Sequence, residues 1–301
     1  MMGQPGPDGL EYCPEVETYL VHSQHVNQTF KIQVMRPIQK RGEVLRLPTL
    51  YATDGNLAFD VLKGLCWSAQ MSGHLALRFV LVGIGYPTDS PLSGTLLRMR
   101  DLTFPGYPQL CTEAPPWEDV LVPDRGAKLF CGAEEFQQFL ADELVPFIEE
   151  RCGTRDQERT YFGHSLGAGF GLFTLFTRPD LFRNYILSSP GLIYHGQSSA
   201  GIRYEEYDFV LQQARRAIAS GLSLSGRRVY MSVGEEEEFE PLLAQWRFTS
   251  SFYRMVSLLK SAAIPGLELT AEVFPGETHM AAWPMAFNHG VRNVLRSAGD
   301  P

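Results

Sequence analysis

The residues best suited to do chemistry lie in the pentapeptide GHSLG, residues 163–167. It separates a short run of strand-forming residues, 160–163, from an apolar helical pattern over residues 166–177. A G-x-S-x-G sequence at such a junction is typical of a nucleophile elbow, in which a tight turn lifts the serine hydroxyl above a sheet edge. We therefore predict Ser165 as the nucleophile of an acyl-transfer reaction. A glycine-rich turn with an inactive serine is the alternative.

A serine nucleophile needs a general base, and His279 is the candidate that fits. Enzymes with this elbow carry the base in a loop after the last strand, in the chain order serine, acid, histidine. The last predicted strand, 267–274, is followed by Pro-Gly-Glu-Thr and then His279. His195 also follows a strand but is a weaker competitor, and His289 lies inside the last predicted helix.

The orienting acid is expected in the run of four glutamates that follows the strand 228–233 and Gly234. A carboxylate at this strand end would hold the imidazole and stabilise its charged form. Only one or two of the glutamates can point inward, because burying several like charges together is costly. The residues alone leave the choice open, and a fully solvated acidic turn is the alternative.

Acyl transfer also requires two N–H donors that face the developing oxyanion. One is expected from the residue after the nucleophile, the backbone N–H of Leu166. The other is expected from the loop after the third strand, Asp54-Gly55-Asn56, where we assign the backbone N–H of Asn56. The second assignment follows from topology alone.

The elements that must position these residues form an alternating pattern. Two β-rich runs, 16–22 and 29–35, indicate a hairpin, and strands and helices alternate afterwards, which predicts a mostly parallel sheet of about eight strands in one α/β domain. Residues 86–128, after the fourth strand, form a long irregular insertion without a predicted element of their own. The other predicted strands are 48–53, 77–84, 160–163, 185–188, 228–233 and 267–274, and the predicted helices are 57–71, 133–150, 166–177, 205–219, 243–262 and 280–295.

Composition excludes several classes of function. Lys+Arg of 26 against Asp+Glu of 34 gives a net charge of −8, so nucleic acid is not an expected partner. No apolar window is long enough to span a membrane, and no zinc or P-loop motif occurs, so no metal or cofactor is expected. Residues 1–14 are expected to form a loose tail without a secretion signal, which predicts a cytoplasmic protein with reduced thiols. Pairing of Cys111 with Cys131 in an oxidising compartment is the alternative.

Segments throughout residues 16–297 together resemble the putative-esterase, or esterase-D-like, family of α/β-hydrolases. Within that family they look most like the branch of ferric-enterobactin and salmochelin esterases. The resemblance implies a single α/β-hydrolase domain over residues 15–301. The segments that carry it are LPTLYATDGNLAF (47–59), FVLVGIGYP (79–87), RMRDLTFPG (98–106), YFGHSLGAGFGLFTLFTRPDLF (161–182), YILSSPGL (185–192), VYMSVGEEEE (229–238) and FPGETHMAAWP (274–284).

The resemblance also implies roles for individual residues. It implies a serine carboxylic-ester hydrolase that works through an acyl-enzyme, with Ser165 as nucleophile and His279 as base. Family members often carry Gly-x-x-Glu or Gly-x-x-Asp after the strand, which points to Glu237, with Glu235 and Glu236 next. Relatives also place an oxyanion donor after the Asp-Gly pair, in agreement with Asn56.

The same resemblance gives expectations for the substrate, a small-molecule ester. Basic side chains near RMRDLT face an anionic ligand in the siderophore branch, so Arg98 and Arg100 become substrate-contact candidates, with structural salt bridges as the alternative. Trp117, in the proline-rich insertion, is a candidate to cap the pocket, or a packing residue. Acidic residues in the insertion would repel a polyanionic ferric catecholate, which leaves a lactone or a small neutral, acetyl or cinnamoyl ester open. A hydrolase fold that binds a ligand without catalysis is the alternative function.

Overall fold

The computed structural model describes residues 16–37, 46–71, 78–88, 90–105, 131–154, 157–197, 203–241 and 243–295. The predicted tail at residues 1–14, the candidate Trp117 and Cys111 lie outside these residues. Cys131 is a free thiol.

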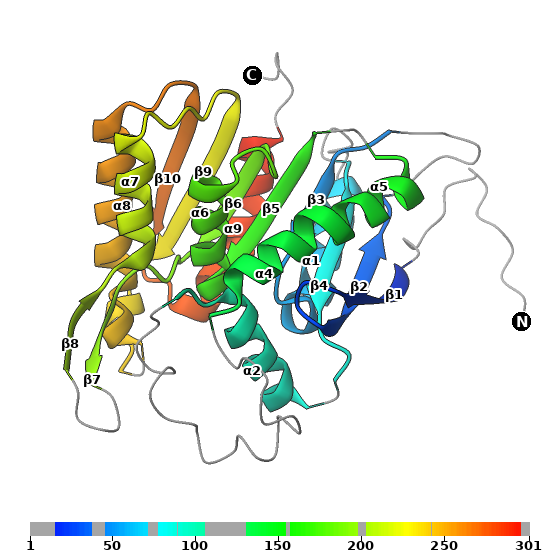
Figure 1. The fold of residues 1–301 in the computed structure, drawn as a ribbon, viewed down its shortest axis with the longest axis horizontal. Coiled ribbons are helices and arrows are strands. Elements are labelled where there is room, and N and C mark those ends of the chain that lie inside the picture. Colours follow the sequence, from blue (N-terminus) through cyan, green and yellow to red (C-terminus); the bar gives the residue numbers. More distant parts are fainter. Residues whose placement is uncertain are drawn as a thin grey trace, which may run out of the picture.

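An eight-stranded sheet forms the centre of the molecule, in the order β1-β2-β4-β3-β5-β6-β9-β10 (Figure 1). β1 pairs antiparallel with β2, and β2 pairs antiparallel with β4, whereas all later neighbours are parallel. This confirms the predicted sheet and its leading hairpin. The strands are β1 (Val16–Ser23), β2 (Gln28–Met35), β3 (Thr49–Ala52), β4 (Val80–Gly85), β5 (Arg159–His164), β6 (Asn184–Ser188), β9 (Arg227–Gly234) and β10 (Leu267–Phe274).

Helices cover both faces of this sheet because the central strands are apolar on both sides. Successive side chains of a strand point to opposite faces, so in β5 Tyr161 packs into one hydrophobic core and Phe162 into the other. In Figure 1, α6 lies in front of the central strands and α9 lies behind them. The core of Phe162 is shared with α1 (Gly55–Met71) and α9 (His279–Val294). The other core takes in α4 (Ala133–Gln138), the π-helical η2 (Phe139–Leu144), α5 (Val145–Cys152), α6 (Leu166–Thr177), α7 (Phe209–Ala219) and α8 (Phe248–Ala262).

Two expectations about the elements were wrong. The insertion contains a helix, α2 (Pro91–Leu102), whose start is set by the Ser90 side chain, which accepts a hydrogen bond from Ser93 N, and by proline at the first helical position. The helix expected over residues 205–219 begins only at Phe209, because residues before it form β8 (Arg203–Tyr207), paired antiparallel with β7 (Tyr194–Gln197).

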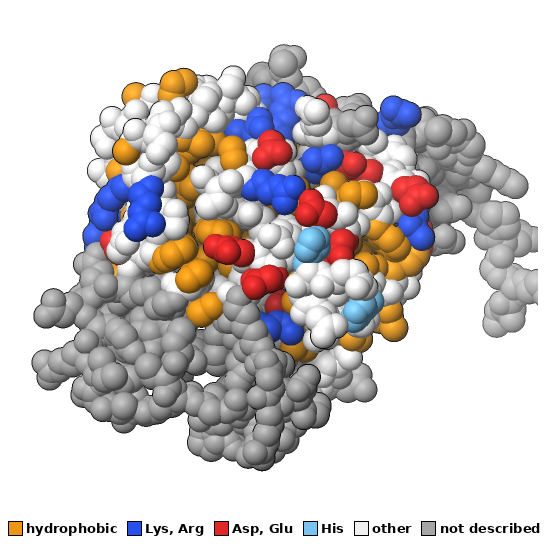
Figure 2. Space-filling model, viewed as in Figure 1, with side chains coloured by type: hydrophobic (Ala, Val, Ile, Leu, Met, Phe, Trp, Pro, Cys, Tyr) orange, Lys and Arg blue, Asp and Glu red, His pale blue; other side chains and the backbone are white. Residues whose placement is uncertain are grey.

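The surface of the described residues carries charges of both signs. Figure 2 shows acidic and basic side chains intermixed on the face viewed in Figure 1. Among the helices that the structure describes, none combines the length and the apolar character that a bilayer crossing requires.

Candidate active site

The predicted catalytic residues lie at one edge of the sheet. Ser165 directly follows β5, Glu237 follows β9, and His279 follows β10. These three strands are parallel, so their carboxyl ends meet at the same edge, which is where ligands bind in open α/β sheets.

Ser165 sits in the sharp turn expected of a nucleophile elbow. Its backbone has φ 59° and ψ −119°, a conformation that side-chain-bearing residues rarely adopt and that persists where surrounding contacts enforce it. The contacts are present here, because Ser165 N donates to Ser188 O at 2.9 Å and Ser165 O accepts from Gly169 N and Gly191 N at 3.0 and 3.1 Å. The turn is tight enough that a Cβ at Gly163 would lie 2.4 Å from the backbone of Gly167. Gly163 is therefore required by the geometry of the turn, and a Cβ at Gly167 would lie 2.6 Å from Thr53 Oγ1.

Ser165 and His279 line the same cavity, which has a volume of about 240 Å³. Within the described part of the chain the Ser165 side chain forms no hydrogen bond with His279, so the two groups face a shared space rather than each other directly. Such contacts often tighten only when substrate is bound. The remaining lining residues are Thr53, Asp54, Leu57, Ala58, Thr95, Arg98, Phe162, His164, Met280 and Trp283.

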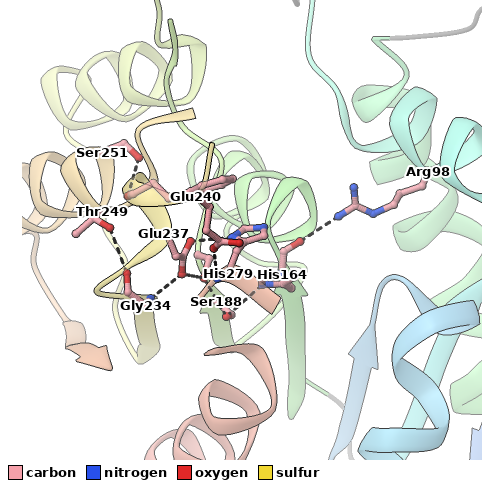
Figure 3. Close-up of polar contacts among 11 residues, drawn as sticks. Arg98, His164, Ser188, Gly234, Glu237, Glu240, Thr249, Ser251 and His279 are labelled. Carbon is pink, nitrogen blue, oxygen red and sulfur yellow. Dashed lines mark hydrogen bonds and ion pairs between the residues drawn. The ribbon is translucent and has the colours of Figure 1, made fainter. Parts of the chain in front are cut away.

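The Glu237 carboxylate holds His279 in a fixed orientation. Glu237 Oε2 lies 2.7 Å from His279 Nδ1, while Glu237 Oε1 accepts from Gly234 N and Ser189 Oγ, both at 2.6 Å (Figure 3). Glu237 is fully buried, and Gly234 N and Ser189 Oγ both donate to it, an arrangement that suits a carboxylate acting only as an acceptor. Nδ1 of His279 then carries the proton, and Nε2 is left with a free lone pair.

The turn after β9 decides which glutamate reaches the histidine. Glu237 begins the short 3₁₀ helix η3 (Glu237–Phe239), which directs its side chain inward. Glu235 is exposed and accepts from Gly276 N at 3.0 Å, and Glu236 is half-buried without a contact to His279. A Cβ at Gly234 would lie 2.3 Å from Glu277 O, so only glycine allows this close approach of the two loops.

His279 is also fixed by its backbone and by rings on both sides. It is the first residue of α9, and its N–H donates to Glu240 Oε1 at 2.7 Å, a carboxylate placed where the helix dipole favours it. Its ring centroid lies 4.2 Å from that of Phe248 and 4.4 Å from that of His164. The imidazole is thus held between two rings and has little rotational freedom.

His164 is a buried, neutral neighbour of that imidazole. Burial, together with the nearby His279 and Arg98, lowers the pKa of His164 well below its ordinary value of 6.5. Its Nδ1 lies 3.3 Å from Ser188 Oγ. Since His164 stays uncharged, it does not oppose the positive charge that a general base at His279 would acquire.

The two predicted oxyanion donors lie at the starts of two helices that cover opposite faces of the sheet. Leu166 opens α6, and Asn56 is the second residue of α1. The Asn56 side chain is used structurally, because its Oδ1 accepts from Tyr86 N at 2.6 Å and its Nδ2 donates to Tyr86 O at 2.8 Å. Its neighbours Asp54 and Leu57 line the cavity. The assignment of the Asn56 N–H stays a prediction.

The two predicted substrate arginines have different surroundings. Arg98 lines the cavity and pairs with Asp54, whereas Arg100 pairs with the buried Asp101 through contacts of 2.6 and 3.0 Å. Asp101 also accepts from the hydroxyl of Tyr86 at 2.9 Å. Arg100 is therefore part of a buried polar cluster and is not among the residues that line the cavity.

Comparison with known proteins identifies the family. A family model described as "Putative esterase" matches residues 114–294. The chain belongs to this esterase family. The esterase is 25% identical over 292 residues to ferri-bacillibactin esterase BesA of Bacillus subtilis (strain 168), an alignment that covers 95% of this chain and 91% of that relative. It is 30% identical over 197 residues to the siderophore enterobactin esterase of Emericella nidulans, over 63% of this chain and 58% of that one.

A solved structure bears out the predicted fold class. Siderophore hydrolase EstB from Aspergillus nidulans superposes on the esterase with a TM-score of 0.73 and 19% sequence identity, covering 100% of both chains. The eight-stranded sheet with its leading antiparallel hairpin is thus an α/β-hydrolase fold.

Four side chains around His279 were missed in the sequence: Ser189, Glu240, Phe248 and His164 as a ring neighbour. Ser189 comes directly after β6, and Glu240 comes three residues after Glu237. A polar residue directly after a central parallel strand was a usable signal for Ser189. Phe248 carried none, because an aromatic residue at the start of a helix is ordinarily a core residue.

Proposed function

We propose that this esterase hydrolyses its substrate through an acyl-enzyme, with Ser165 as nucleophile, His279 as general base and acid, and Glu237 as the orienting carboxylate. One observation carries the proposal: the buried Glu237–His279 contact of 2.7 Å ends in the cavity that Ser165 enters from a left-handed turn. A structural histidine would have no need of a cavity shared with a strained serine.

Acylation follows from these positions. His279 Nε2 accepts the proton of the Ser165 hydroxyl as Oγ bonds to the carbonyl carbon of the ester. The carbonyl oxygen becomes an oxyanion, which we expect the backbone N–H groups of Leu166 and Asn56 to bind. When the carbon–oxygen bond of the ester breaks, the leaving alkoxide takes the proton from His279 and departs as the alcohol. Glu237 stabilises the imidazolium during the transfer.

Deacylation repeats these steps with water. His279 accepts a proton from a water molecule as its oxygen bonds to the acyl carbon, and the second oxyanion uses the same donors. Collapse of this intermediate breaks the bond to Ser165 Oγ, which recovers its proton from His279. The products are the free acid and the unchanged enzyme.

Labelling with a fluorophosphonate tests the nucleophile. We expect a single adduct on Ser165 by intact mass and peptide mapping, and no adduct in Ser165→Ala, whose kcat for an activated ester should fall by about 10⁴-fold or more. Ser261→Ala is the matched control, because Ser261 is an exposed serine at the end of α8 whose hydroxyl donates only to Leu258 O. A folded wild-type protein that forms no adduct would contradict the assignment.

The proposed substrate class is a siderophore-like ester or lactone. BesA, which aligns with nearly the whole chain, is named for ferri-bacillibactin, and the Emericella nidulans relative is named for enterobactin. The cavity opens at the edge of the sheet, beside α2 of the long insertion, where a substrate larger than the cavity itself can extend outward. Trp117 stays a proposed cap of this pocket.

A specific observation favours a second candidate, a smaller uncharged ester with an apolar acyl group. One wall of the cavity is apolar, and Leu57 and Met280 on it are 61% and 51% exposed, which leaves them free to contact a ligand. The cation on the cavity wall, Arg98, is already paired with Asp54. Such a wall binds an apolar group more readily than a polyanion.

A comparison of kcat/KM separates the two candidates. The substrates are a siderophore trilactone with bound ferric ion, the same compound without iron, and a neutral p-nitrophenyl ester. Preference for the trilactones in either form would support the siderophore proposal, and preference for the neutral ester by more than about tenfold would support the second.

A further inference from the structure

Arg98, on α2, forms hydrogen bonds to two other segments of the candidate site, one at Asp54 and one at His164. Its guanidinium donates to both carboxylate oxygens of Asp54, from Nε and, at 3.2 Å, from Nη2. Nη2 also donates to His164 O at 3.3 Å (Figure 3). Arg98 lies on α2, Asp54 precedes α1, and His164 ends β5, so one side chain connects three segments that are distant in the sequence.

The pairing uses Nε and Nη2 of the guanidinium, two of the three nitrogens that could donate to a substrate anion. The Arg98 side chain is 22% exposed and Asp54 11%, so the ion pair is largely withdrawn from water. A guanidinium matches a carboxylate in a two-pronged geometry, and replacing that carboxylate by a substrate group would leave Asp54 buried without its partner. Arg98 is thus better suited to hold protein segments together than to exchange ligands.

The two loops that Arg98 joins carry the two expected oxyanion donors. Asp54, with φ 61°, is the turn residue that leads into Asn56. The His164 carbonyl belongs to the peptide that enters Ser165 and Leu166. The loops are packed closely, since a Cβ at Gly167 would lie 2.6 Å from Thr53 Oγ1 and 3.4 Å from Asp54 Oδ2.

We propose that Arg98 is a positioning residue that fixes the separation of the Asn56 and Leu166 N–H groups, through Asp54 on one side and the His164 carbonyl on the other. This inference rests on the proposed function. It gives the insertion a role in the chemistry: α2 supplies the clamp across the oxyanion hole. Electrostatic stabilisation depends on donors that are already in place, so a small change in their separation lowers the rate of the chemical step.

The test compares Arg98→Gln, Asp54→Asn and the double variant. We expect kcat to fall by about 10- to 100-fold in Arg98→Gln, for a neutral and for an anionic p-nitrophenyl ester alike, with KM changed by less than about threefold. The rate of fluorophosphonate labelling should fall in parallel, because that reagent also places an oxygen among the oxyanion donors. The double variant should be no slower than the slower single variant, since both break the same clamp.

Arg159→Gln is the matched control. Arg159 starts the same strand that His164 ends, it donates to Glu149 at 2.7 Å, and its exposure of 18% is close to that of Arg98. The control should lose a similar amount of thermal stability while kcat stays within about twofold of wild type.

Three outcomes would overturn the inference. A rise in KM confined to the anionic ester would make Arg98 a substrate ligand. An unchanged kcat with only a lower Tm, as in Arg159→Gln, would make it a structural residue. If the losses of kcat in the two single variants added up in the double variant, Arg98 and Asp54 would act independently of each other. Failure of the proposed function has a different signature, because the wild type itself would then not be labelled at Ser165.

Discussion

Replacing Glu237 by glutamine changes one contact of the site and leaves the others in place. In Glu237→Gln the amide oxygen can still accept from Gly234 N and Ser189 Oγ, which now donate to Oε1 at 2.6 Å. The amide NH₂ then faces His279 Nδ1 across the 2.7 Å contact. Because this group donates, it favours the tautomer with the proton on Nε2, which cannot accept the proton of Ser165.

The magnitude follows from the interaction that is lost. With the two charges centred about 4 Å apart, a carboxylate stabilises an imidazolium by about 4 kcal/mol at the effective dielectric constant of about 20 that suits protein sites. The hydrogen bond from the introduced amide to His279 Nδ1 must be broken before the histidine can return to the active tautomer, which adds about 1 kcal/mol to the activation barrier. A total of about 4–5 kcal/mol corresponds to a fall in kcat of about 10³- to 10⁴-fold. The fold should remain intact, because the shape of the side chain and two of its three contacts are preserved.

The assay is steady-state hydrolysis of an activated ester, with thermal unfolding measured on the same samples. Glu235→Gln is the comparison, since Glu235 is exposed and should lose less than about threefold in kcat. Alanine at 237 is a poorer choice, because it leaves the buried Gly234 N–H and the Ser189 hydroxyl without an acceptor, at about 1–3 kcal/mol each. A Glu237→Gln enzyme within tenfold of wild type, or an equal loss in Glu235→Gln, would refute the reasoning.

Two further predictions concern neighbours of the proposed triad. The folded protein keeps His164 neutral at pH values below 6.5, its ordinary pKa, whereas the unfolded chain binds a proton at this residue. The free energy of unfolding should therefore fall by about 1.4 kcal/mol per pH unit as the pH drops below 6.5. Urea denaturation at pH 7.5, 6.5 and 5.5 should show that the free energy of unfolding depends less on pH in His164→Asn than in the wild type. An equal pH dependence in the two proteins would contradict the assignment of this effect to His164. Met280→Asp should abolish any rise of kcat/KM with acyl-chain length, which reaches about fourfold per buried methylene at most. Leu20→Asp, at a side chain 68% exposed on β1, should leave that rise unchanged.

The positions of the chemistry-bearing residues could be predicted from local sequence. Ser165 and His279 each follow a strand whose apolar run is visible in the sequence, and parallel strands end at one edge. The elbow was predictable because Gly163 is required by a backbone contact, as the 2.4 Å approach of its Cβ position to Gly167 shows. The mostly parallel α/β sheet followed from the alternation of strands and helices, and the family resemblance implied the α/β-hydrolase fold.

Local reasoning was wrong where the pattern of apolar residues was weak. The helix α2 is polar on average and lies among prolines, although Ser90 and Pro91 together form a helix start. Residues 205–207 of the β8 strand were assigned to the helix that follows it, because the charged and aromatic residues of the strand, RYEEY, carry no clear helix boundary. Both elements depend on partners elsewhere in the chain for their stability.

The sequence by itself supplied the candidates for nucleophile and base and the sheet edge at which they meet, since each depends on the order of residues along a strand and its following turn. The family resemblance already pointed to Glu237, but the residues alone left the choice among the glutamates open. The tertiary structure brings Glu237 to His279, because that contact depends on the direction of a 3₁₀ turn packed against the loop that carries His279. It also placed Arg98 between Asp54 and the His164 carbonyl, a contact across 44 and 66 residues. Such contacts are set by the packing of whole elements, and no local pattern of residues records them.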